Sequence, residues 1–163
     1  NNENRYPLII KGARQIGKTE SVKHFADRNY ESVVSINFAL EKQFQMILSD
    51  GYDVENIIKN ISLIDPSKKF IANRTLIIFD EIQSCERALT ALKYFCEEAP
   101  EYHIIAAGSL LGVALNREKY SFPVGKVDMI TLYPLDFEEF LWATANTKIG
   151  SLIRESFENF IAF

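Results

Sequence analysis

Two glycines, a lysine and a threonine at fixed spacing are the residues of this sequence best suited to chemistry. Gly12, Gly17, Lys18 and Thr19 lie in the segment GARQIGKT and match the pattern G-x-x-x-x-G-K-[ST] at every fixed position. The glycines let a loop curl so that its N–H groups point inward, the lysine supplies a mobile positive charge, and the threonine hydroxyl can ligate Mg²⁺. The segment therefore predicts a loop that binds the phosphate groups of a nucleotide.

The flanking segments predict the elements that would position this loop. Before it, residues 6–11 contain an apolar run of the right length for a buried strand. After it, residues 19–29 carry Val22, Phe25 and Ala26 at helical spacing. A helix that begins here would add unpaired N–H groups and the positive end of its dipole to the phosphate site. The alternative is an ordinary turn between strand and helix, with two glycines and a surface lysine.

A second stretch, TLIIFDE at 75–81, ends a short apolar run with two carboxylates. Such a run is typical of a central parallel strand, and ligands bind at the carboxyl edge of open parallel sheets. There Asp80 could hold Mg²⁺ opposite Thr19, and Glu81 could polarise a water molecule for attack on the terminal phosphate. The alternative is a strand followed by a helix that Asp80 or Glu81 caps.

The other elements alternate between strand and helix, which predicts an α/β fold. We expect strands at 32–38, 102–107 and 126–132, and helices at 40–49, 54–63, 84–98, 110–115, 136–143 and 149–162, with a loop or hairpin at 117–125. The stripe Phe137, Phe140 and Leu141 is expected to be core, with a groove for a partner as the alternative. His24 and His103 have no ligand partners at metal spacing, so both are interpreted as structural.

Composition narrows the class of protein. The chain has 163 residues, 47% of them apolar and 25% charged, which predicts one globular domain. Its net charge of −4 gives no support for nucleic-acid binding, although a local basic patch stays open. No apolar run has the length of a membrane span. Cys85 and Cys96 are interpreted as reduced thiols of a cytoplasmic protein. Because residue 1 is not Met and the chain ends in the apolar run SFENFIAF, we expect a piece of a longer protein.

With these motifs in hand, the sequence resembles AAA-type P-loop ATPases. More closely, it is similar to the bacterial and archaeal "AAA domain" ATPases that are usually followed by a C-terminal domain of unknown function. The stretches that carry the resemblance are GARQIGKTE (12–20), LIIFDEIQ (76–83), AAGSLLG (106–112) and SFPVGKVDMITLYPLDFEEF (121–140). It implies that 1–163 is one ATPase core, a three-layer α/β domain whose parallel sheet has the order 5-1-4-3-2, with helices on both faces.

The resemblance also implies roles for individual residues. Asp80 matches the metal-binding aspartate, Glu81 the catalytic glutamate, and Ser109 a polar sensor that faces the γ-phosphate. Asn37 matches a position that in many relatives hydrogen-bonds the glutamate and holds it inactive. Ser109 as a helix N-cap and Asn37 as a strand-end turn residue are the alternatives. The expected nucleotide contacts are Gly12, Ala13, Arg14, Gln15, Ile16, Gly17, Lys18, Thr19 and Glu20.

The expected function is hydrolysis of ATP with Mg²⁺ as cofactor, in which water attacks the γ-phosphate, Lys18 stabilises the developing charge and Glu81 is the base. The lid domain of the family would follow position 163. No arginine finger can be assigned: Arg117 is the nearest candidate, and an exposed loop arginine is the alternative. We therefore expect low activity from this chain alone, and a homo-oligomer is a candidate state of the full-length protein. The alternative function is a nucleotide-dependent switch that binds ATP with little turnover. A P-loop kinase is disfavoured, because nothing resembles an arginine-rich lid.

Overall fold

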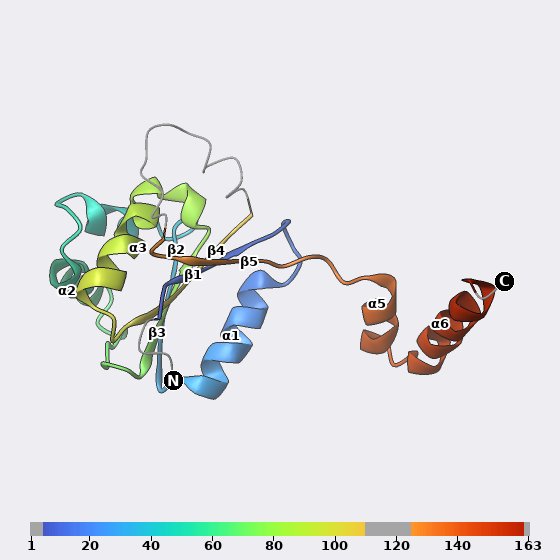
Figure 1. Ribbon diagram of the computed structural model, residues 1–163. Helices are drawn as coiled ribbons and strands as arrows, with labels where there is room; N and C mark the ends of the chain where they lie inside the picture. The colour runs from blue at the N-terminus through green and yellow to red at the C-terminus, as the bar shows by residue number, and fades with distance from the viewer. Residues whose placement is uncertain (1–4, 110–124, 162–163) are drawn as a thin grey trace. The chain divides into compact units, whose positions relative to one another are not determined.

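The structure, a computed structural model, describes residues 5–109 and 125–161, and Figure 1 shows how their elements are arranged. The order along the chain is β1 (Leu8–Lys11), α1 (Lys18–Asn29), β2 (Ser32–Asn37), η1 (Lys42–Leu48), α2 (Val54–Ile64), β3 (Thr75–Asp80), η2 (Ile82–Ser84), α3 (Glu86–Glu98), β4 (His103–Gly108), β5 (Asp128–Thr131), α5 (Phe137–Ala143) and α6 (Thr147–Ile161). The expected helix at 110–115 lies outside the described residues, as does the loop at 117–125 apart from Gly125.

The five strands form one parallel sheet in the order β2-β3-β4-β1-β5. This confirms the expected order, which is the same when it is written from the other edge. In the register, Asn37 lies opposite Asp80, and Lys11 lies opposite both Gly108 and Thr131. The carboxyl ends of the strands therefore meet along one edge, and β4 lies between β1, which leads into the glycine loop, and β3, which ends in Asp80.

Alternating side chains of the sheet pack against helices on both of its faces. On β3, Leu76 and Ile78 join the cluster that contains Val22 and Ala26 of α1. Ile77 and Phe79 point the other way, into the larger cluster with residues of α2 and α3. Figure 1 shows α1 on one side of the sheet and α2 and α3 on the other. Because both faces are covered, every residue of β3 is buried, which explains its unbroken apolar run.

The helices expected at 40–49 and 84–98 differ from the expectation in kind or in bounds. The segment expected as a helix at 40–49 forms the 3-10 helix η1, which still buries Phe44, Ile47 and Leu48, while Leu40 is 82% exposed. Apolar spacings of three and four suit both kinds of helix, so the sequence pattern does not distinguish them. The helix expected at 84–98 begins at Glu86, because η2 occupies the preceding turn and Cys85 has a non-helical backbone at φ −138°.

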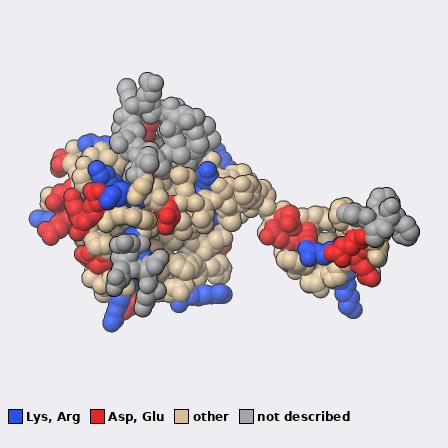
Figure 2. Space-filling view, in the orientation of Figure 1, with Lys and Arg blue, Asp and Glu red and all other residues tan. Residues whose placement is uncertain are grey.

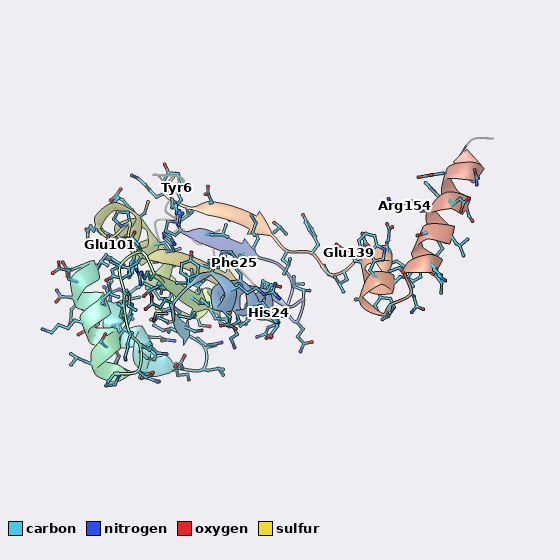
Figure 3. The ribbon with its side chains drawn as sticks, turned by 90° about the horizontal axis from the view of Figure 1, so that it is seen from below. Tyr6, His24, Phe25, Glu101, Glu139 and Arg154 are labelled. Atoms are coloured by element: carbon cyan, nitrogen blue, oxygen red, sulfur yellow. The ribbon has the colours of Figure 1, made fainter. Side chains whose placement is uncertain are left out.

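The chain divides into two compact units, Asn1–Leu132 and Tyr133–Phe163, so the assignment of 1–163 to one ATPase core stays a prediction. In the second unit, Asp136 and Glu139 form a reciprocal capping box at the start of α5. Arg154 of α6 pairs with Glu138 of α5, and Figure 3 shows Arg154 and Glu139 on their helices. Within this unit Leu141 is buried, but Phe137 and Phe140 are 64% and 52% exposed. The expectation that all three belong to the core is therefore wrong for the two phenylalanines, because a unit of two helices encloses few side chains completely.

Among the described helices, none combines the length and the apolar character that a bilayer crossing requires.

Candidate nucleotide-binding site

The loop between β1 and α1 has a backbone that depends on its glycines. Gly12 has φ +156°, and a Cβ atom there would lie 2.3 Å from the backbone oxygen of Leu132, so only glycine fits beside β5. Gln15 and Gly17 have left-handed φ values of +62° and +89°. Left-handed residues in such a loop turn successive N–H groups toward a common centre, where an anion can bind. The loop leads directly into α1, whose first turn adds further unpaired N–H groups.

Lys18 places a positive charge inside this loop. Its side chain is only 8% exposed, and its Nζ donates to the backbone oxygens of Gly12 at 3.0 Å and of Ala13 at 2.5 Å. Within the described part of the chain, no carboxylate lies within ion-pair distance of Lys18. Because a buried charge is costly without a counter-charge, this amine is well suited to bind an anionic ligand.

Asp80 connects three elements at the edge of the sheet. The Thr19 hydroxyl on α1 donates to Asp80 Oδ2 at 3.1 Å, although the two residues are 61 positions apart. The Asn37 amide on β2 donates to the same oxygen at 3.2 Å, and the N–H of Glu81 donates to Asp80 Oδ1 at 3.0 Å. Thr19 and Asp80 thus offer a hydroxyl and a carboxylate oxygen side by side, which are the donors that Mg²⁺ prefers.

Two protein oxygens can be enough for a magnesium ion at this edge. Across residues 5–109 and 125–161, no group of three or more His, Cys, Asp or Glu side chains gathers as a metal site. Mg²⁺ is usually held by one or two protein oxygens together with substrate phosphates and water. The pair Thr19 and Asp80, next to a phosphate-type loop, therefore fits Mg²⁺ bound with a nucleotide.

Glu81 lies just beyond β3, in an unusual backbone conformation. Its φ and ψ are +48° and +43°, the left-handed region that non-glycine residues seldom adopt. Its carboxylate accepts a hydrogen bond from the side-chain amide of Gln83. The expected contact between Asn37 and Glu81 is not formed, because the strand register places Asn37 opposite Asp80. The carbonyl oxygen of the Asn37 side chain instead accepts from the N–H groups of Ala39 and Leu40.

Ser109 follows the carboxyl end of β4, between the strands that lead to Lys18 and Asp80. Its hydroxyl oxygen is buried, and no described residue forms a hydrogen bond with it. Buried hydroxyls normally form a hydrogen bond. The Ser109 hydroxyl is therefore suited to form one with a bound ligand. The role of Ser109 as a sensor stays a prediction.

The other predicted contacts lie in and after the loop. Ala13, Arg14 and Gln15 are exposed, and Ile16 is partly buried. Glu20 lies in the first turn of α1 and pairs with His24 at 3.6 Å on the exposed face of that helix, where Figure 3 labels His24. Arg117, the finger candidate, lies outside the described residues.

Gln83 is one residue of this site that the sequence pattern did not identify. Its position in the segment DEIQ, two residues after Glu81, was the available signal. A second example is Glu41, whose carboxylate accepts from the backbone N–H of Asn37 at 2.8 Å and so fixes the end of β2.

Comparison with known proteins supports the same interpretation of the fold. The family described as "AAA domain" matches residues 4–141 of this chain. Among solved structures, a Walker-type ATPase of Pyrococcus abyssi is similar, with a TM-score of 0.52 and 20% sequence identity. The similarity covers 83% of this chain and 51% of that chain, so this chain spans about half the length of that protein. No curated protein matches the sequence.

The family match covers most of the chain and includes both the glycine loop and the Asp80 strand. The structural likeness agrees with a sheet whose order is that of a P-loop fold. The chain therefore belongs to the AAA domain family and is an AAA-type P-loop ATPase domain.

Proposed function

We propose that this domain binds ATP together with Mg²⁺ and hydrolyses the bond to the γ-phosphate. The contact between Thr19 and Asp80, beside the buried amine of Lys18, is the observation that carries the proposal. This contact places two oxygens that can bind a metal beside the glycine loop, although Thr19 and Asp80 are far apart in the sequence. Bound Mg²⁺ would neutralise phosphate charge and thereby stabilise the transition state.

Each residue of the site has a task in this mechanism. The loop N–H groups and Lys18 bind the phosphate oxygens, and Lys18 exchanges its two backbone carbonyl partners for the phosphates. Thr19 and Asp80 would hold the metal ion. Glu81 accepts a proton from the attacking water as a general base, and Ser109 donates its hydroxyl to the γ-phosphate or to that water. Asn37 keeps the Asp80 carboxylate in place.

We also propose that the site works in a cytoplasmic protein and that the full-length protein assembles as a homo-oligomer. Both cysteines are unpaired thiols, which fits a reducing compartment.

On the face seen in Figure 2, Lys and Arg are interspersed with Asp and Glu, so the visible surface offers no support for a nucleic-acid partner.

Phosphate release by the full-length protein, measured with and without Mg²⁺, tests the hydrolytic function. Glu81→Gln is expected to bind ATP but to lose about 10²–10⁴ in turnover, because the shape is kept and the base is removed. Glu98→Gln, at an exposed glutamate at the end of α3, is the matched control and should keep the wild-type rate. Tight ATP binding without turnover in the wild-type protein would instead favour the nucleotide-dependent switch.

A second measurement compares the ATP turnover rate of this chain alone with that of the full-length protein. A finger supplied by a neighbouring subunit contributes about 10³–10⁵ in rate where it is used. We therefore expect this chain alone, as a monomer, to turn over more slowly than about one per second. A faster rate from the monomer would show that hydrolysis does not require an arginine finger from a neighbouring subunit.

A further inference from the structure

The side chain of Gln83 is held against the carboxylate of Glu81. Gln83 lies in η2, two residues after Glu81, and its Nε2 donates to Glu81 Oε2. Within residues 5–109 and 125–161, the other carboxylate oxygen of Glu81, Oε1, accepts no hydrogen bond. The bond therefore fixes one oxygen of Glu81 and leaves the other able to accept a proton.

Charge determines which way the Gln83 amide faces. If the amide were turned over, its carbonyl oxygen would face a carboxylate, and two acceptors cannot form a hydrogen bond. With the amide as it stands, Gln83 Oε1 is buried and has no partner among the described residues. A buried carbonyl without a partner is unfavourable, and it is tolerated here because the opposite end of the amide meets a charge.

The backbone of Glu81 makes such a restraint useful. A left-handed residue directly after a strand ends the regular alternation of side chains, so the strand itself no longer fixes where the carboxylate points. Asn37, another amide at this edge, is engaged with Asp80 and with the N–H groups of Ala39 and Leu40. Gln83 is thus the amide that contacts the proposed base.

We propose that Gln83 is the positioning residue of Glu81: its amide orients the carboxylate so that Oε1 faces the attacking water. This role rests on the proposed hydrolysis of ATP. It acts through Glu81, so it should affect the chemical step rather than the binding of the nucleotide.

The kinetic test uses Gln83→Met in the full-length protein, because Met keeps the length of the side chain and removes the N–H donor. We expect kcat to fall about tenfold while the ATP affinity stays within about twofold of wild type, as for loss of one charge-assisted hydrogen bond. Gln83→Glu should be at least as slow, because it places a second carboxylate against the first. Gln43→Met, at an exposed glutamine of η1, is the matched control.

A double variant tests whether the effect passes through Glu81. In the Glu81→Gln background, adding Gln83→Met should change the residual rate by less than about twofold, because the group that Gln83 positions is already lost. An independent tenfold loss in that background would show a structural role and overturn the proposal. So would a kcat for Gln83→Met that equals or exceeds the wild-type value.

A measurement without nucleotide keeps the inference separate from the proposed function. In ¹⁵N-labelled protein, the side-chain amide signal of Gln83 is identified by its loss in Gln83→Met. The Glu81→Gly variant removes the carboxylate and suits the left-handed backbone, so we expect it to move that amide proton signal upfield. An unmoved signal would overturn the contact, and with it the proposal, even if hydrolysis is confirmed. A moved signal in a protein that hydrolyses no ATP would support the contact while the proposed function fails.

Discussion

Asn37 and Asp80 lie opposite each other on neighbouring parallel strands, and the Asn37 amide donates to Asp80 Oδ2 at 3.2 Å. The same oxygen accepts from Thr19 on α1, so one carboxylate joins β2, β3 and α1. Asn37 therefore contacts the proposed metal ligand rather than the proposed base. This relationship changes what a substitution at Asn37 should do.

Asn37→Ala is expected to raise the Mg²⁺ concentration needed for half-maximal phosphate release by several-fold. Asp80 loses one of the donors that fix its orientation, and metal ligands depend on such outer partners. The basal rate at saturating Mg²⁺ should not increase, because Asn37 has no hydrogen bond to Glu81. An increased basal rate would instead support a direct restraint of Glu81 by Asn37.

Lys18→Ala is expected to weaken ATP binding by about tenfold to a hundredfold, the effect of losing a charge-assisted hydrogen bond. The fold should persist, since Lys18 forms no ion pair with a described carboxylate. Calorimetric titration with ATP measures the affinity, and circular dichroism checks the fold. Lys23→Ala, at an exposed position of the same helix, should bind ATP as the wild type does. Equal affinity in the two variants would remove Lys18 from the phosphate site.

Ser109→Ala should affect the rate of phosphate release but not the free energy of unfolding. Removing a buried hydroxyl that has no described partner should leave the free energy of unfolding unchanged or slightly higher. The rate of phosphate release should fall by about 10²-fold if the hydroxyl stabilises charge in the transition state. Urea unfolding and single-turnover kinetics measure the two effects. A loss of stability with an unchanged rate would make Ser109 a structural residue.

Gly12→Ala tests the close approach of the glycine loop to β5. The new Cβ atom would lie 2.3 Å from the Leu132 backbone oxygen, so the backbone must shift, at a cost of about 1–3 kcal/mol in the free energy of unfolding. Gly51→Ala is the matched control, because Gly51 also has a positive φ, +123°, but open space around it. Chemical denaturation of both variants should show the larger loss for Gly12→Ala. Equal losses would mean that backbone conformation, not the contact, sets the requirement for glycine.

His103 should make the first unit less stable in acid. Burial and the neighbouring Arg5 guanidinium lower the pKa of His103, whose Nδ1 lies 2.7 Å from the Tyr30 hydroxyl and whose Nε2 lies 2.8 Å from Arg5. The folded state therefore binds fewer protons at this site than the unfolded chain. The free energy of unfolding that His103 contributes is fully present above the ordinary histidine pKa of about 6.5. It is lost as the pH falls through the lower pKa that His103 has in the folded state.

The test compares urea unfolding at about pH 7.5 and about pH 5, on either side of the ordinary histidine pKa. His103→Gln, which cannot be protonated, should lose less stability between these two values than the wild type does. If the wild type and His103→Gln lose the same amount, other groups determine the acid sensitivity.

The sequence by itself determined the parts of the site that are built locally. The spacing of Gly12, Gly17, Lys18 and Thr19 predicted the loop, because its backbone and its charge depend on neighbouring residues. The apolar run before Asp80 predicted β3, because a strand covered on both faces must be apolar throughout. The order of the sheet came from the resemblance to AAA-type ATPases, since residue spacing alone does not specify which strands pair.

Only the tertiary structure decided how the side chains at the sheet edge are paired. The register of β2 against β3 placed the Asn37 amide on Asp80, and a one-position change would have placed it elsewhere. The left-handed backbone of Glu81 turned its carboxylate toward Gln83, and no local pattern predicted that conformation in a residue other than glycine. These contacts depend on non-local strand pairing and on one backbone angle, which is why the sequence predicted the residues of the site but not their partners.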